Sequence, residues 1–248
     1  MLTAEEKKRY DRQIMIRGLG EQGQEKLKRA KVIIAGSGGL GSAASLYLVA
    51  AGVGMIRVVD HDRVELSNLN RQVLHWHKDI GRNKVESAAE KLSQLNPGVK
   101  IEPTREMISE ANIRQLVAGF DLIVDAVDNM PTRYLLNKAA LESRIPLVHG
   151  AVYGFEGRAM TIIPGKTACL RCVYRGLIPK EKPPVIGVAP AVIGCIQATE
   201  AIKYIVGIGK LLTNRVLVYD GLNMKLSELL VKRDPNCEHC GHLNMEEQ

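Results

Sequence analysis

Lys31-Val-Ile-Ile-Ala35 runs directly into Gly36-Ser-Gly-Gly-Leu-Gly41, and this stretch decides the fold. Its first five residues form an apolar, β-branched run that is typical of a strand buried on both faces. The glycines that follow have the GxGxxG spacing, which lets the backbone approach a phosphate at the N-terminus of a helix. The stretch therefore predicts a strand, a tight turn and a helix, with an anion site at the turn.

An acidic residue farther along favours a nucleotide at this turn. Asp60 ends another apolar run, nineteen residues after Gly41, where a carboxylate can accept hydrogen bonds from both ribose hydroxyls. We expect a nucleotide site that includes Gly36, Gly38, Gly39, Gly41 and Asp60. A turn whose glycines only allow strand and helix to pack tightly is the alternative, and it leaves Asp60 unexplained. An NAD-dependent oxidoreductase is a second alternative, since it uses the same motif.

The order of apolar segments predicts a doubly wound α/β fold. Short runs rich in Val and Ile alternate with segments of helical spacing, as in proteins with a parallel sheet covered by helices. The expected strands are Lys31–Ala35, Met55–Asp60, Leu122–Asp125 and Pro146–His149, and the expected helices are Gly41–Ala51, Asn83–Leu95, Ala111–Val117 and Pro131–Ser143. This order predicts a Rossmann-like, mostly parallel sheet.

The pattern changes after Gly150. Strand-like segments at Tyr153–Pro164, Val216–Asp220 and Leu226–Val231 surround a helix-like segment at Val192–Ile208, and we expect them to extend the sheet with antiparallel strands. No Gly/Ser-rich linker separates the halves. We therefore expect one domain over residues 1–248, with a helical arm at 1–30, a nucleotide-binding half at 31–150 and a second half at 151–248.

Composition and charge narrow the functional classes. The 248 residues carry a formal net charge of +7, with 25% charged and 46% hydrophobic residues, which excludes disordered and collagen-like proteins. The longest uncharged stretch, Pro183–Thr199, is shorter than the roughly 20 apolar residues of a membrane span. Because the N-terminus lacks a secretory signal, we expect a cytoplasmic protein without membrane contact. The charge suits an anionic partner, but the few aromatic residues disfavour a nucleic-acid-binding module.

Polar residues near the nucleotide motif suggest phosphate and metal binding. Arg71 and Lys84 follow Asp60, and they would concentrate positive charge where a triphosphate extends from the turn. A solvated loop is the alternative. Asp128 and Asn129 follow the strand that ends at Asp125, at an edge where a carboxylate can hold magnesium beside phosphate oxygens. Alternatively, Asp128 caps the helix that begins near Pro131.

Two CxxC pairs predict a zinc site. Cys169 and Cys172 are separated by 64 residues from Cys237 and Cys240, and four thiolates fit tetrahedral zinc. Because four protein ligands leave no open position, we expect a structural metal. The alternatives are a redox CxxC pair and substitution of a ligand by His239 or His242. Cys195 lies in an apolar run, where it is expected to be a small buried residue, although a catalytic role remains an alternative.

Taken together, the motifs resemble the MoeB/ThiF/HesA family, the prokaryotic relatives of the ubiquitin-activating enzymes. The resemblance extends over nearly the whole chain. It rests on Arg9-Tyr-Asp-Arg12-Gln-Ile, Gly36–Gly41, Val59-Asp60-His-Asp62, Ser67-Asn-Leu-Asn-Arg-Gln72, Gly81-Arg-Asn-Lys84, Asp125–Asn129, the two CxxC pairs and Gln197-Ala-Thr-Glu-Ala-Ile-Lys203.

The resemblance implies an adenylation reaction. The family uses ATP and magnesium to activate the C-terminal Gly-Gly carboxylate of a small ubiquitin-like sulfur-carrier protein as an acyl-adenylate, in molybdopterin, thiamin or related biosynthesis. It further implies a carrier-binding role for residues 151–248. By this resemblance, Gly39 and Gly41 lie against the nucleotide and Asp60 binds its ribose. The phosphates are held by Asn68, Arg71 and Lys84. Asn129 adjoins the cofactor, and Asp128 serves magnesium and the attacking carboxylate.

The resemblance also implies a homodimer and a separate sulfur source. Arg12 matches an arginine that reaches the neighbouring subunit's ATP site, with a surface salt bridge as the alternative. Some family members carry a cysteine that receives the activated carrier, but residues 175–188 contain none. We therefore expect the reaction to stop at the adenylate, with a sulfur donor acting in trans and no C-terminal rhodanese-like domain. Adenylation of a peptide or a tRNA base by the same fold is the remaining alternative.

Overall fold

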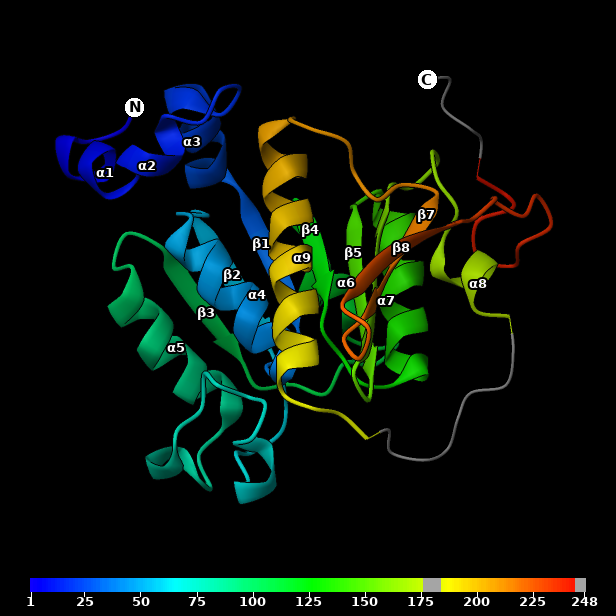
Figure 1. Cartoon of the computed structure of the whole chain (residues 1–248), viewed down its shortest axis with the longest axis horizontal. Helices are drawn as coiled ribbons and strands as arrows, with labels where there is room; N and C mark the ends of the chain where they lie inside the picture. The colour runs from blue at the N-terminus through cyan, green and yellow to red at the C-terminus, as the bar shows by residue number, and fades with distance from the viewer. Residues whose placement is uncertain (176–183, 244–248) are drawn as a thin grey trace.

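Figure 1 shows the computed structural model, which describes residues 1–175 and 184–243. Within these residues, eight strands form one sheet in the order β3-β2-β1-β4-β5-β6-β7-β8. The strands are β1 (Lys31–Ala35), β2 (Met55–Val59), β3 (Lys100–Thr104), β4 (Leu122–Asp125), β5 (Leu147–Tyr153), β6 (Glu156–Ile162), β7 (Arg215–Asp220) and β8 (Lys225–Leu230). The strand order reverses between β1 and β4, which is where open α/β sheets bind ligands.

The sheet has a parallel part and an antiparallel part. β3, β2, β1, β4 and β5 pair in parallel, whereas β6, β7 and β8 continue the sheet from β5 in antiparallel pairs. The expected Rossmann-like sheet with an antiparallel extension is thus confirmed. The buried strands β1 and β4 are almost uniformly apolar, because helices cover both of their faces.

Two hydrophobic cores, one on each face of the sheet, hold the helices in place. One core joins the sheet to α3 (Gly20–Arg29), α4 (Gly39–Ala50), α5 (Lys84–Leu95) and α9 (Val188–Val206), and α4 and α9 pack side by side across this face in Figure 1. The other joins it to α6 (Ile113–Val117), α7 (Met130–Ser143) and α8 (Leu170–Val173). The short helices α1 (Ala4–Arg9) and α2 (Asp11–Ile14) precede α3.

Several elements differ from the expectations. The edge strand β3 was not expected, because its sequence Lys-Ile-Glu-Pro-Thr is half-exposed and contains Pro103. α4 begins at Gly39, two residues before the expected start, and β5 continues through Gly150 to Tyr153. In the described part of the chain, none of the helices has both the length and the apolar character that crossing a bilayer requires.

Candidate nucleotide-binding site and metal centre

A cavity of about 230 Å³ lies at the carboxyl ends of the parallel strands, which form the lower edge of the sheet in Figure 1. The loops that follow β1, β2, β3 and β4 form most of its walls. It brings together most of the residues expected at a nucleotide site, namely Gly36, Gly38, Gly39, Asp60, Arg71, Lys84, Asp128 and Asn129. Residues from five separate stretches of sequence therefore converge at the switch in strand order.

The glycine loop allows backbone segments to pack unusually closely. Gly36 has a φ of +100°, and a Cβ there would lie 2.6 Å from the Ala126 carbonyl oxygen. A Cβ at position 41 would lie only 1.9 Å from the Gly36 carbonyl oxygen. Gly41 does not line the cavity, so in this structure its lack of a side chain serves the packing of α4 against the turn.

Asp60 is held firmly at the end of β2. Its Oδ2 accepts a hydrogen bond from the Ser37 N–H at 2.8 Å, and its Oδ1 accepts one from the Asp62 N–H at 2.9 Å. The carboxylate thereby joins β2 to the glycine loop. It also lines the cavity, and each of its oxygens has a further lone pair for a ribose hydroxyl.

Three cationic side chains reach the cavity. Lys84 is 7% exposed, and its Nζ donates to Asp62 Oδ2 at 2.8 Å. Arg71 donates to the Ser67 carbonyl oxygen at 2.8 Å. The third cation, Arg133, was not expected from the sequence: it donates to the Val127 carbonyl oxygen at 2.7 Å and supports the loop after β4. Cations around a cavity of this kind suit a polyanionic ligand.

Asp128 and Asn129 are neighbours in the loop after β4, but they have different contacts. Asn129 is the N-cap of α7, because its Oδ1 accepts a hydrogen bond from the Thr132 N–H at 3.0 Å. The alternative in which Asp128 caps this helix is therefore wrong. Asp128 is exposed and lines the cavity, and its carboxylate provides the hard oxygen ligand that magnesium prefers.

Asn68 and Arg12 lie outside the cavity. Asn68 is 7% exposed, and its Oδ1 accepts a hydrogen bond from the Glu65 N–H at 3.0 Å, so it stabilises the segment that carries Arg71. Arg12 is exposed on α2, and α2 lies at the top of Figure 1, away from the carboxyl ends of the parallel strands. Within one chain, Arg12 therefore makes no contribution to the cavity wall.

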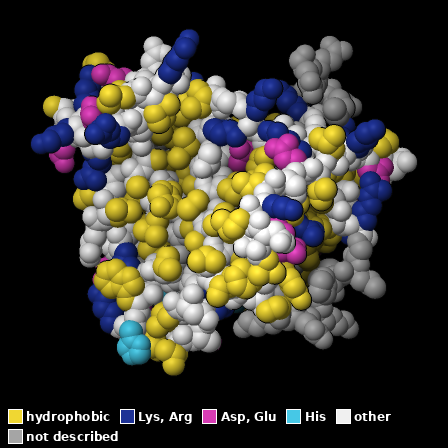
Figure 2. Space-filling view, viewed as in Figure 1, with side chains coloured by type: hydrophobic (Ala, Val, Ile, Leu, Met, Phe, Trp, Pro, Cys, Tyr) yellow, Lys and Arg dark blue, Asp and Glu magenta, His cyan; other side chains and the backbone are white. Residues whose placement is uncertain are grey.

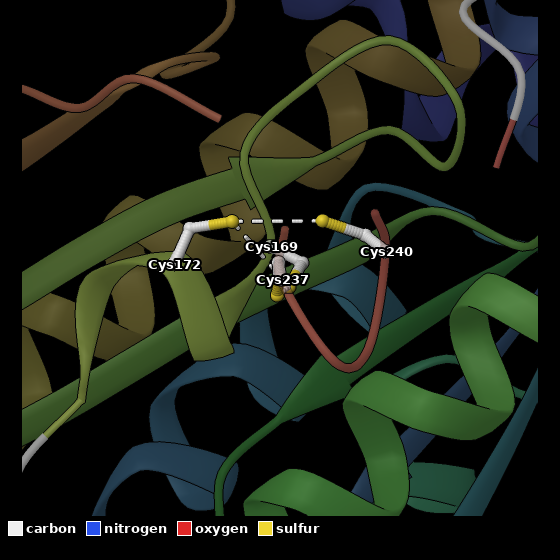
Figure 3. A group of neighbouring side chains, drawn as sticks. All are labelled: Cys169, Cys172, Cys237 and Cys240. Atoms are coloured by element: carbon white, nitrogen blue, oxygen red, sulfur yellow. Dashed lines mark hydrogen bonds between the residues drawn. The ribbon is translucent and has the colours of Figure 1, made fainter. Parts of the chain in front are cut away.

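The four cysteines of the CxxC pairs meet in one buried cluster, as Figure 3 shows. All four Sγ atoms lie within 4.8 Å of one another. The Cys169–Cys237 and Cys172–Cys240 Sγ distances are 3.7 and 3.5 Å. Tetrahedral zinc with Zn–S bonds of about 2.3 Å separates its sulfurs by about 3.8 Å. The cluster thus fits zinc closely.

The surroundings of the cluster favour a bound cation over free thiols. Burial raises the pKa of Cys240 to about 11 and also raises that of Cys169, whereas hydrogen bonds from the Cys240 and His239 N–H groups outweigh burial and lower the pKa of Cys237. A bound cation would stabilise the thiolate form of the two thiols whose pKa is raised. The Asp234 N–H donates to Cys172 Sγ at 3.4 Å, as second-sphere groups do around metal thiolates. His239 hydrogen-bonds Asn137 through Nδ1 at 2.9 Å and is not part of the cluster.

The cysteine outside the cluster has a different environment. Cys195 is half-buried on α9, where burial raises its pKa, and a protonated thiol is a poor nucleophile. The prediction that residues 175–188 contain no receiving cysteine falls largely on residues 176–183, outside the described residues.

Comparisons with known proteins find relatives that match nearly the whole chain. The profile of the ThiF family matches residues 10–239. The sulfur carrier protein adenylyltransferase of Thermus thermophilus is 45% identical over 96% of this chain and 92% of its own length. The SAMP-activating enzyme E1 of Haloferax volcanii is 44% identical over 97% and 91%, and the molybdopterin-synthase adenylyltransferase of Escherichia coli is 40% identical over 97% and 98%.

A solved structure with the same architecture contains a nucleotide. The crystal structure of E. coli MccB with ATP has a TM-score of 0.85 and 26% sequence identity, and the match covers 94% of this chain and 74% of that one. Another crystal structure, of MccB with selenomethionine-labelled MccA, has a TM-score of 0.86 at 25% identity, over 97% of this chain and 76% of that one.

Proposed function

The chain belongs to the ThiF family, and from that premise we propose that it is an ATP-dependent adenylyltransferase for a small ubiquitin-like sulfur-carrier protein. The carrier's C-terminal Gly-Gly carboxylate is the group that is activated. The observation that carries the proposal is the cavity itself, where the glycine loop, Asp60, two basic side chains and Asp128 converge. The names of relatives that are 40 to 45% identical support the carrier as substrate.

The chemistry suits these residues. The carrier carboxylate forms a new bond to the α-phosphorus of ATP, the bond from that phosphorus to the bridging oxygen breaks, and pyrophosphate leaves. A carboxylate is already ionised at neutral pH, so no general base is needed. Arg71 and Lys84 reduce the repulsion between the carboxylate and the phosphates. Asp60, Gly38 and Gly39 line the cavity; Asp60 would hold the ribose, and the glycine backbone would face the phosphates.

Magnesium is the metal that this arrangement would accept beside ATP. It would be held by Asp128, and when bound it would neutralise charge on the phosphates and polarise the phosphorus that is attacked. Asn129 holds the same loop by capping α7. Asp128 lines the cavity, and we infer that it binds the metal and also orients the incoming carboxylate.

The position of Arg12 supports a homodimer. Because Arg12 does not line its own cavity, a role in phosphate binding requires it to enter the cavity of a second subunit. Figure 2 shows an apolar band over α4 and α9, and the exposed apolar residues of these two helices include Tyr47 and Val188, each 58% exposed. An apolar face of this kind is typical of subunit interfaces.

The β7–β8 hairpin is the proposed docking surface for the carrier. Its exposed apolar side chains are Leu222, Met224, Leu226, Leu229 and Leu230. An unpaired edge strand lined with leucines favours binding of another folded protein. A carrier bound there would extend its C-terminal tail over the sheet towards the cavity, and a separate sulfur donor would then act on the adenylate in trans.

ATP–pyrophosphate exchange tests the proposed function. The purified protein is assayed with magnesium and a panel of ubiquitin-like carriers ending in Gly-Gly, with each carrier also tested after removal of its terminal glycine. We expect exchange with one carrier, dependent on that glycine, and its loss in Arg71→Ala. Tight ATP binding without exchange for any carrier would contradict the carrier assignment, and a preference for NAD over ATP would indicate an oxidoreductase.

Peptide adenylation is a second candidate because the fold also matches MccB bound to MccA. The 26% identity to MccB is well below the 40 to 45% identity to carrier-activating relatives, which favours the carrier. Exchange assays with short peptides and with tRNA separate these candidates, since each alternative expects exchange with its own substrate and none with a carrier.

A further inference from the structure

A buried histidine lies directly behind the glycine loop. His75 is 3% exposed and has no place in the proposed chemistry. Its Nε2 lies 2.9 Å from the Ser37 carbonyl oxygen, and its Nδ1 lies 3.0 Å from Ser87 Oγ on α5. His75 therefore links the glycine loop to a neighbouring helix.

The hydrogen-bond partners determine where the protons lie. A carbonyl oxygen only accepts, so Nε2 must carry the hydrogen that reaches Ser37. Lys91 Nζ donates to Ser87 Oγ at 2.8 Å, so the Ser87 hydroxyl hydrogen is directed to an acceptor, and His75 Nδ1 at 3.0 Å and the Asp79 carboxylate are the acceptors beside it. Burial lowers the pKa of His75 below its usual value, in agreement with a neutral ring protonated on Nε2.

The far end of this network is also buried and charged. Lys91 Nζ lies 2.5 Å from Asp79 Oδ2, and the two side chains are 6% and 0% exposed. Asp79 and His75 belong to the same segment as Arg71, while Ser87 and Lys91 lie on α5. The network therefore fastens the arginine-bearing segment to α5 and to the glycine loop at once.

Peptide geometry relates this anchor to the cavity. In a trans peptide the C=O and the following N–H point in opposite directions. The Ser37 carbonyl points inward to His75, so the N–H of Gly38 points outward, on the side where Gly38 lines the cavity. Gly38 is also the N-cap of α4, where N–H groups face anions. The Ser37 N–H is fixed in turn by Asp60.

We propose that His75 is a positioning residue for phosphate binding: by holding the Ser37 carbonyl, it aims the Gly38 N–H at a phosphate of the bound nucleotide. The proposal rests on the proposed function only in placing a nucleotide in this cavity. It makes no use of the carrier. The effect of His75 should accordingly be confined to the phosphates of the ligand, and should be absent for a ligand that lacks them.

Two substitutions isolate the Nε2–H donor. His75→Phe keeps an aromatic ring of similar shape and removes the donor, whereas His75→Gln places an amide N–H near the position of Nε2. His77→Phe is the matched control, since His77 is exposed two residues farther along. Dissociation constants are measured by isothermal titration calorimetry with the magnesium complex of a non-hydrolysable ATP analogue and, separately, with adenosine.

We expect His75→Phe to weaken binding of the ATP analogue by about tenfold or more, as loss of a buried hydrogen bond does. Adenosine binding should stay within about twofold of the unaltered protein, because its contacts do not involve the Gly38 N–H. His75→Gln should restore most of the affinity for the analogue, and His77→Phe should leave both ligands unaffected. A purely structural role would weaken both ligands together.

Ser87→Ala provides the test if His75→Phe does not fold. It removes the hydroxyl that orients the ring, and we expect it to weaken the ATP analogue by about threefold while leaving adenosine unchanged. The proposal is overturned if the folded variants keep the full preference for the analogue over adenosine, or if both ligands weaken equally. Selective weakening without exchange on any carrier would contradict the carrier assignment and support the role of His75.

Discussion

The two ends of the sheet hold their functional groups in different ways. At the parallel end, the loops after neighbouring strands meet because parallel strands end at one edge, and close backbone contacts such as Gly41 with Gly36 set the geometry. At the antiparallel end, four thiols join α8 to the C-terminal region across 64 intervening residues. Substitutions in the cavity should therefore impair binding or catalysis, whereas substitutions in the cluster should impair folding.

The largest effect is expected for loss of a zinc ligand. Cys237→Ser should abolish stoichiometric zinc and lower the free energy of unfolding by about 3 kcal/mol or more, because metal binding stabilises only the folded chain. Zinc is quantified with a colorimetric chelator after denaturation, and stability by urea unfolding. Cys195→Ser, which alters the thiol outside the cluster, is the control and should retain one zinc. A wild-type protein that purifies without zinc and unfolds identically with a chelator would contradict the prediction.

The next effect separates activity from stability. Lys84→Met keeps the buried stem of the side chain and removes the ammonium group from the cavity. We expect pyrophosphate exchange to fall by about 10² to 10³-fold, as for loss of a charge-stabilising group, with little change in melting temperature. Lys100→Met, on the exposed edge strand β3, should exchange at the unaltered rate. Equal losses in both variants would show that general charge, and not the cavity, matters.

A smaller effect tests the backbone contact in the glycine loop. In Gly41→Ala the added methyl group would meet the Gly36 carbonyl oxygen at 1.9 Å, so the turn or α4 must shift. We expect a loss of about 2 to 3 kcal/mol in unfolding free energy, as in overpacked sites, together with weaker ATP binding. Gly98→Ala meets only ordinary contacts and should change stability by less than about 0.5 kcal/mol. An unchanged Gly41→Ala protein would mean that the turn is not tightly packed.

The smallest effect concerns pH. Burial alone would raise the pKa of Asp79, but hydrogen bonds from Lys91 and the Trp76 N–H outweigh it and hold the pKa at about 2. Because the folded-state pKa lies below the unfolded value, this contribution to stability is present above about pH 4 and is lost as pH falls towards 2. The stability gap between wild type and Asp79→Asn should shrink by about 2 kcal/mol over that range. Any zinc released by acid would be lost from both proteins, so comparing them at the same pH removes this effect. A difference in unfolding free energy that does not change with pH would contradict the prediction.

Features that depend on a local sequence pattern could be predicted from the sequence alone. The strands β1, β2 and β4, the glycine turn, Asp60 and the four-cysteine cluster follow from periodicity and spacing along the chain. β3 was not predicted because an edge strand tolerates proline and charged residues, so its sequence lacks the apolar run that marks a buried strand. Arg133 and His75 were not predicted because their roles depend on contacts that the sequence pattern does not reveal. Arg133 hydrogen-bonds the Val127 carbonyl, and His75 hydrogen-bonds the Ser37 carbonyl. Arg12 shows a further limit, since its proposed partner lies on another subunit.

The spacing of the cysteines also sets an order of events during synthesis. Cys169 and Cys172 leave the ribosome before Cys237 and Cys240, with 64 residues between the pairs. At about 5 to 20 residues per second, this interval lasts about 3 to 13 s. Strands β1 to β5 precede Cys169 in the sequence. The nucleotide-binding half can therefore fold before Cys237 and Cys240 have been synthesised. Filling of the proposed zinc site would therefore follow synthesis of the nucleotide-binding half, and scarcity of zinc would first affect nascent chains in which that half is already made.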